Sequence, residues 1–145
     1  MANVTSVMTA NPACCTAETP LREVARMMID NDCGEIPVVD DKGIPVGVVT
    51  DRDITVRIVA EGRDTMGATA AEAMSSPVKT IREDSSLKDA TDVMEKAKIR
   101  RVPVVDAGGK LSGIVSLADV AMGAKDKLTV EVVKEVSTPG KGQKH

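Results

Sequence analysis

The sequence contains no phenylalanine, tyrosine or tryptophan. The core must therefore be built from aliphatic side chains, methionine and alanine. The same absence removes the rings on which proteins usually stack the bases of single-stranded nucleic acid. With 19 basic and 22 acidic residues the formal net charge is −3, so no basic surplus attracts a phosphate backbone. Both observations disfavour a nucleic-acid-binding protein.

Histidine and cysteine are scarce as well. The only histidine is His145, the last residue, and the three cysteines are Cys14, Cys15 and Cys33. A lone terminal histidine disfavours a Ser-His-Asp or Cys-His nucleophilic centre and a histidine-based metal site. An odd number of cysteines without framework spacing disfavours a secreted disulfide scaffold. We interpret the cysteines as small buried hydrophobes, with a metal or redox pair at Cys14 and Cys15 as the alternative.

Long apolar runs are also missing, and the N-terminus lacks the basic start and apolar stretch of a signal peptide. We therefore expect a cytoplasmic protein. The 145 residues correspond to one domain, or to two small units that share a core. An apolar fraction of 42% and a charged fraction of 28% are typical of a globular chain.

The second half of the sequence repeats the first. The segment EIPVVDDKGIPVGVVTDRDI (35–54) aligns with RVPVVDAGGKLSGIVSLADV (101–120), an offset of 66 residues. With the same offset, TPLREVARMMIDN (19–31) aligns with SSLKDATDVMEKA (85–97). Agreement over most of both halves identifies an internal duplication. We therefore expect the chain to contain two copies of one structural unit.

Each half has the pattern of a β-α-β-β-α unit. Apolar residues recur at helical spacing after Thr19 and Ser85, which we predict to be N-caps. IPVVD and VPVVD, then VGVVT and SGIVS, are short β-branched runs separated by the turn sequences DDKG and DAGG. A short strand in ACCTA or PVKTI precedes each first helix, and a second helix begins after VGVVT and SGIVS.

A unit of about sixty residues buries too little surface to be stable alone. We therefore predict an α/β (α+β) fold in which two β-α-β-β-α units pack sheet to sheet about a pseudo-twofold axis, with two related clefts at the junction. The expected organisation is a first unit at 7–60, a linker at 61–70, a second unit at 71–125, and a C-terminal helix with a disordered tail at 126–145.

A hydroxyl residue and an aspartate three positions later occur at the same place in both units. They are Thr50 with Asp53, and Ser116 with Asp119. One interpretation is a capping box, in which the pair satisfies the first N–H groups of the following helix. The other is a ligand site, because the pair lies where a strand ends and a helix begins. A carboxylate accepts hydrogen bonds only, which suits the paired hydroxyls of a ribose.

Arginines accompany these pairs. Arg52 lies inside the first copy, and Arg100 and Arg101 precede the strand VPVVD. A guanidinium suits phosphate, so the combination describes a nucleotide site. Alternatively, these arginines are solvated charges at a helix surface and a strand edge. Since adjacent strand residues point to opposite faces, at most one of Arg100 and Arg101 faces a cleft.

The repeated pattern M-T/S-x-P, L-x-x-A, G-x-I-P-V-V-D and G-x-V-T-D-R-D-I resembles the cystathionine β-synthase (CBS) domain. Two copies in tandem, over about 7–123, resemble a Bateman module. The resemblance implies binding of AMP, ADP, ATP, S-adenosylmethionine or NAD, with no obligatory cofactor, catalytic residue or metal. It also implies dimerisation into a flat disc.

The resemblance further implies that the base is held by the half opposite the ribose-binding pair. This places Ile99, Arg100 and Arg101 with Thr50 and Asp53, and places Cys33, Gly34 and Glu35 with Ser116 and Asp119. Because Arg52 and Arg101 belong to the first set, we expect the cleft at Asp53 to bind a nucleotide more tightly than the cleft at Asp119.

The favoured function is a non-catalytic sensor of adenosine nucleotides that acts in trans on an unidentified effector protein. The alternative is a nucleic-acid-binding or protein-interaction module without nucleotide sensing. An enzyme that uses Asp53 and Asp119 in acid–base catalysis is a third hypothesis. It is disfavoured because the sequence has no internal histidine, no glycine-rich phosphate loop and no metal-binding cluster.

Overall fold

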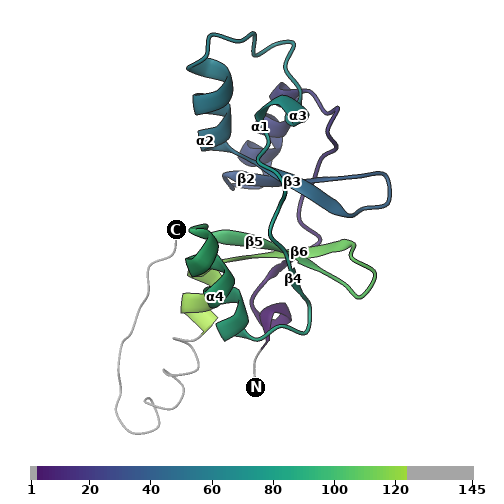
Figure 1. Cartoon of the computed structure of the whole chain (residues 1–145), viewed down its shortest axis with the longest axis vertical. Coiled ribbons are helices and arrows are strands. Elements are labelled where there is room, and N and C mark those ends of the chain that lie inside the picture. Colours follow the sequence, from purple (N-terminus) through teal and green to yellow (C-terminus); the bar gives the residue numbers. More distant parts are fainter. Residues whose placement is uncertain (1–2, 124–145) are drawn as a thin grey trace, which may run out of the picture.

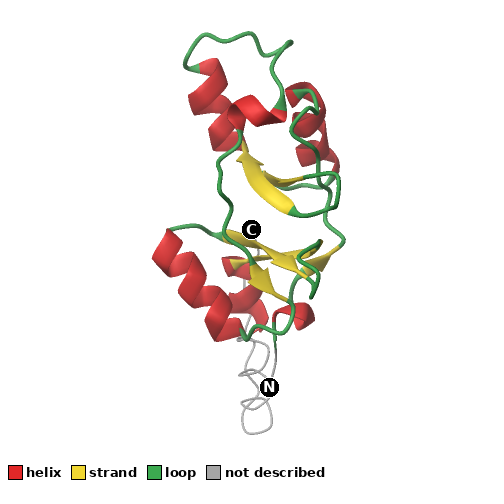
Figure 2. Ribbon diagram, turned by 45° about the vertical axis from the view of Figure 1, so that its right-hand side comes forward, coloured by secondary structure: helices red, strands yellow, loops and turns green. Residues whose placement is uncertain are grey.

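The computed structural model describes residues 3–123, and these form two α/β halves stacked along the long axis of the molecule (Figure 1). Figure 2 shows the two sheets facing each other at the centre, with the helices on the outer sides. This is the predicted sheet-to-sheet arrangement. The expected helix and tail at 126–145 lie outside the described residues. No helix in the described part is long and apolar enough to cross a membrane.

The first half contains the predicted helix, two strands and second helix, followed by a short helix that the sequence analysis did not predict. They are α1 (Leu21–Asp30), β2 (Glu35–Val39), β3 (Pro45–Thr50), α2 (Asp51–Asp53), its π-helical continuation η2 (Ile54–Val59), and α3 (Ala70–Ala73). The second half contains β4 (Ile81–Arg82), α4 (Leu87–Ala97), β5 (Arg101–Val105), β6 (Leu111–Ser116) and helical residues 117–123. Two short elements lead the chain, η1 (Val4–Ser6) and β1 (Thr9–Ala10).

The two hairpins have the same register. β2 and β3 pair antiparallel with Glu35 opposite Thr50, and β5 and β6 pair antiparallel with Arg101 opposite Ser116. Each hairpin shifts register once, at Val38/Val39 and at Val104/Val105. The duplication seen in the sequence is therefore a duplication of local geometry, and the α/β fold class is confirmed.

Each half has its own core, and both cores are aliphatic as predicted. Alternating strand residues supply the inward face, while α1 and α4 cover it with residues at helical spacing. The largest fully buried side chains include Val24, Ile36, Val38, Val49 and Ile58 in the first half, and Val4, Val102, Val104 and Val115 in the second.

The segment that leads each half pairs with the hairpin of the other half, which the sequence analysis did not anticipate. β1 pairs antiparallel with β6, and Val4 is buried in the core of the second half. In the equivalent place, Ser75 forms a bridge with Val48 of β3. The two halves are thus connected by exchanged backbone hydrogen bonds as well as by facing sheets.

Both predicted N-caps are wrong by one residue. α1 begins after Pro20, and the Thr19 hydroxyl instead accepts the N–H of Thr16 at 3.0 Å. α4 is capped by Ser86 rather than by Ser85, because only Ser86 lies three residues before Asp89 and can complete a reciprocal capping box. The short strand expected before each first helix is β4 in the second half. In the first half it is reduced to a single parallel bridge between Cys15 and Val38.

Candidate functional site

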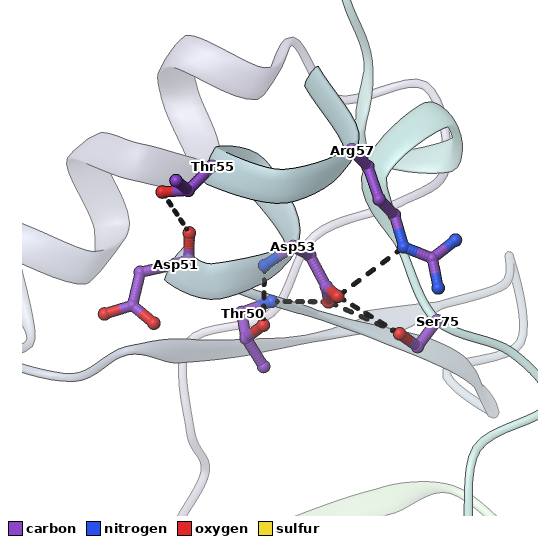
Figure 3. Close-up of polar contacts among 6 residues, drawn as sticks. All are labelled: Thr50, Asp51, Asp53, Thr55, Arg57 and Ser75. Atoms are coloured by element: carbon purple, nitrogen blue, oxygen red, sulfur yellow. Dashed lines mark hydrogen bonds and ion pairs between the residues drawn. The ribbon is translucent and has the colours of Figure 1, made fainter. Parts of the chain in front are cut away.

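Thr50 and Asp53 form a complete capping box at the end of β3 (Figure 3). The Asp53 N–H donates to Thr50 Oγ1 at 3.0 Å, and the Thr50 N–H donates to Asp53 Oδ2 at 3.0 Å. Ser116 and Asp119 make the same two hydrogen bonds at the same distances. The capping interpretation is therefore confirmed for both pairs, and each box holds its aspartate in a fixed orientation at the edge of a sheet.

The Asp53 carboxylate has further partners. The Ser75 hydroxyl donates to Oδ1 at 3.3 Å, and Arg57 Nε lies 3.7 Å from the same oxygen. Figure 3 shows these side chains converging on Asp53, whereas the Asp51 carboxylate points away. Since Ser75 comes from the segment that leads the second half, the carboxylate lies at a contact between the halves. Its side chain is 14% exposed and remains open to a ligand.

A cavity of about 370 Å³ opens beside this carboxylate, and we call it the Asp53 cleft. Thr50 and Asp53 line it from the first half, and Ile99 and Arg101 line it from the second. The resemblance to the CBS domain implied that these four residues come together, and the structure brings them together. Its other lining residues are Glu35, Val48, Ser75, Pro77, Val78, Lys79, Ala97 and Pro103.

A second cavity of about 930 Å³, the Asp119 cleft, lies at the equivalent place. Ser116 and Asp119 line it from the second half, and Cys33 and Glu35 line it from the first, again as predicted. The segment around β1 forms another wall. Both volumes fall in the range of small-molecule sites, about 300 to 1,000 Å³.

Three residues of the expected set, Arg52, Arg100 and Gly34, line neither cavity. Arg52 is exposed on the helix after β3, and Arg100 is exposed just before β5. Gly34 instead accepts the Asp51 N–H on its carbonyl oxygen at 3.0 Å. Arg101, in contrast, lines both cavities. As strand alternation requires, only one of the two adjacent arginines faces a cleft.

Sequence reasoning missed Lys79 and Ser75, which both line the Asp53 cleft. The sequence analysis places Lys79 only in the short strand expected within PVKTI, and it gives Ser75 no role. The signal that could have found these residues is the alignment of their segment, MSSPVK, with MTANPA, which leads the first half in the same way. Lys79 supplies this cleft with a second cation beside Arg101. The expected preference of phosphate-bearing ligands for the Asp53 cleft thus stays a prediction, supported by Lys79 in place of Arg52.

Glu35 and Arg101 occupy equivalent positions in the two halves, and both line both cavities. Burial raises the pKa of Glu35 to about 7, the nearby Arg101 guanidinium opposes this rise, and the Asp53 carboxylate adds to it. The pKa of Glu35 therefore depends on two charges of the Asp53 cleft, the Arg101 guanidinium and the Asp53 carboxylate.

The cysteines differ from one another. Cys15 is buried in the first core, as predicted, whereas Cys14 is exposed, contrary to the interpretation of all three as buried. Burial, together with the neighbouring Cys14, raises the pKa of Cys15 to about 11, so this thiol stays protonated at neutral pH. Within residues 3–123 no three histidine, cysteine, aspartate or glutamate side chains gather into a metal-binding group.

The sequence comparisons identify one family. The CBS domain family model matches residues 4–60 and 70–125. The CBS domain-containing protein YhcV of Bacillus subtilis is 39% identical over 123 residues, covering 84% of this chain and 85% of that protein. The uncharacterized protein MK0525 of Methanopyrus kandleri is 37% identical over 98 residues, which cover 68% of this chain and 50% of that protein. The chain thus matches only half the length of that relative.

Solved structures with the same fold carry different ligands. Hypoxic Response Protein I, with two coordinated zinc ions, has a TM-score of 0.77 at 32% identity, covering 83% of this chain and 98% of that one. CBSX2 in complex with AMP has a TM-score of 0.76 at 28% identity, covering 88% and 99%. The CBS domain pair of MJ0100, in complex with 5′-methylthioadenosine and S-adenosyl-L-methionine, has a TM-score of 0.77 at 27% identity, covering 88% and 98%.

Proposed function

This chain belongs to the CBS domain family and contains two CBS domains in tandem, and from that premise we propose that it is a non-catalytic regulatory module for an adenosine-containing ligand. The ligand binds in the Asp53 and Asp119 clefts between the two domains. Its binding changes how the domains are held together, and an effector protein responds to that change in trans.

One observation carries this proposal. The Asp53 cleft joins a hydroxyl–carboxylate pair from one domain to an apolar side chain and a cation from the other, in a cavity of ligand size. The Asp53 carboxylate accepts from ribose hydroxyls. Val78 and Ile99 offer aliphatic surfaces to the base, while Lys79 and Arg101 pair with phosphate. A ligand with these three parts is a nucleotide.

The Asp119 cleft fits a similar ligand, but fewer cations line it to pair with a phosphate group. Asp119 again offers an acceptor for ribose hydroxyls, and Cys33 offers an apolar contact from the opposite domain. The related structures of CBSX2 and MJ0100 contain AMP, 5′-methylthioadenosine or S-adenosylmethionine, which all share an adenosine group. The shared adenosine group of these ligands supports adenosine recognition in both clefts.

We further propose that two copies of the chain form a homodimer in the cytoplasm. Ile29 of α1 is 70% exposed and Val59 of η2 is 56% exposed. The outer helices therefore carry exposed apolar side chains that a second copy of the chain would cover. All three cysteines are unpaired, as is usual in a reducing compartment.

A thermal-shift screen tests the proposed function. The ligands are AMP, ATP, NAD, S-adenosylmethionine and adenosine, with an external dye because the chain has no aromatic residue. A ligand at about 100 times its Kd should stabilise the fold by roughly 2.7 kcal/mol. The Asp53→Ala/Asp119→Ala double variant should lose the shift, and the exposed Asp41→Ala should retain it. If no ligand shifts the wild-type protein, the proposed function is contradicted, and a structural or purely protein-binding role is favoured.

A further inference from the structure

Glu35 and Arg101 are the first residues of β2 and β5, and each lies opposite the hydroxyl residue of its own domain, Thr50 or Ser116. The duplication makes them equivalent, yet one is an acid and the other a base. Because both line both cavities, each cleft contains the same carboxyl group and the same guanidinium. The two clefts therefore share a pair of opposite charges at their junction.

The clefts differ in the other charges that face them. The Asp53 cleft has Lys79 as a second cation. The Asp119 cleft has Asp32 and Asp119 as further anions, and among residues 3–123 Arg101 is its only lining cation. A phosphate group in the Asp119 cleft therefore depends on Arg101, whereas a phosphate group in the Asp53 cleft contacts Lys79 as well as Arg101.

We propose that Arg101, which lines both cavities together with Glu35, is a shared phosphate-binding residue that makes the two clefts compete for anionic ligands. This inference rests on the proposed function. A phosphate bound in the Asp53 cleft engages Arg101, and the Asp119 cleft then faces a ligand phosphate with carboxylates alone. Binding in one cleft weakens binding in the other, and the weakening is reciprocal. Adenosine carries no phosphate and fills both clefts independently.

The Glu35 carboxyl group responds to the same event. Its pKa is raised to about 7 by burial, and Arg101 opposes the rise. When a ligand phosphate takes Arg101, this opposition is lost and the pKa of Glu35 rises further, so near neutral pH the acid takes up a proton. The competition between the clefts therefore comes from the loss of Arg101 as a phosphate partner, and not from repulsion by Glu35.

Calorimetric titration with AMP and with adenosine tests the inference. The Asp119→Ala variant gives the AMP affinity of the Asp53 cleft alone, and Asp53→Ala gives that of the Asp119 cleft alone. Asp53→Asn and Asp119→Asn, which keep a capping oxygen, serve if an alanine variant does not fold. In the wild-type protein, the second AMP should bind at least about 10-fold more weakly than in the weaker single-cleft variant. The two adenosine affinities should equal the single-cleft values.

The Arg101→Gln variant tests whether Arg101 couples AMP binding in the two clefts. This variant should bind AMP more weakly in both clefts, and its two affinities should no longer depend on each other. The matched control Arg26→Gln, an exposed arginine of α1, should keep the wild-type coupling. If two AMP molecules bind the wild-type protein independently, the proposal that the clefts share Arg101 is wrong, while the proposed function stands. Failure of both AMP and adenosine to bind would overturn the proposed function, and this inference with it.

Discussion

The Ser75 hydroxyl donates to the Asp53 carboxylate at 3.3 Å, although the two residues are 22 positions apart. The bond joins the segment that leads the second domain to the capping box of the first. In the duplicated position Thr9 lines the Asp119 cleft, but within the described residues no bond joins it to Asp119. The two clefts therefore have the same box with different surroundings, and the differences predict different ligand preferences.

Asp53 has two roles that substitutions can separate. Asp53→Ala should lower the free energy of unfolding by about 1 kcal/mol, because the capping box is lost, and should also weaken adenosine binding. Asp53→Asn keeps an oxygen that accepts the Thr50 N–H, so it should retain most of the stability while still weakening adenosine binding. Denaturant unfolding and calorimetry on both variants check this. Normal adenosine affinity in both would show that Asp53 is a cap and nothing more.

Lys79 should give the Asp53 cleft its preference for phosphate. In the Asp119→Ala background, Lys79→Gln should reduce ATP affinity about 10-fold and leave adenosine affinity unchanged, since a charge-assisted bond to phosphate contributes about 1.5 to 3 kcal/mol. The same substitution in the Asp53→Ala background should change neither affinity. An equal loss of ATP affinity in both backgrounds would contradict the placement of Lys79 in one cleft.

The exchanged leading segments require glycine in both hairpins. A Cβ atom at Gly47 would lie 2.9 Å from Met74 Sδ, and one at Gly113 would overlap Met8. Gly113→Ala should lower the free energy of unfolding by about 1 to 3 kcal/mol, the usual cost of overpacking. Adding Met8→Ala should recover part of that loss, as residues in contact do not act additively. Gly108→Ala, where a Cβ atom meets only ordinary contacts, is the control.

Glu35 makes stability depend on pH. Its pKa is about 7 in the folded protein and about 4.5 when exposed, so between these values the folded state holds a proton that the unfolded state has lost. The contribution of Glu35 to the free energy of unfolding therefore falls as pH rises from 4.5 to 7. Glu35→Gln should stabilise the protein at pH 8 by up to roughly 3 kcal/mol and have little effect at pH 4.5. A difference between variant and wild type that is constant with pH would contradict this account.

The duplication made much of the fold predictable. The offset between the domains located both hairpins and both capping boxes. The pairing of Asp53 with the domain that carries Arg101 was implied by the resemblance to the CBS domain. Amphipathic spacing and β-branched runs were sufficient because these elements are local. The N-caps were displaced by one residue because the Thr19 hydroxyl accepts the Thr16 N–H instead, and because Ser86 rather than Ser85 has the spacing to Asp89 that a capping box needs.

The exchange of leading segments was not predictable from local pattern. β1 has only two residues, and its pairing with β6 depends on contacts between positions more than 100 residues apart. The position of Arg52 outside the cleft was not predictable for a related reason. Its position in the sequence beside Asp53 says nothing about which side of the helix faces the cleft, and Lys79 reaches the cleft from a segment distant in sequence.

A crystal structure of the protein with adenosine tests the central claim most directly. The account predicts ribose hydroxyl oxygens within hydrogen-bonding distance of the Asp53 and Asp119 carboxylates, with the base against the opposite domain. Adenosine bound elsewhere, with both carboxylates making only their capping hydrogen bonds, would contradict it.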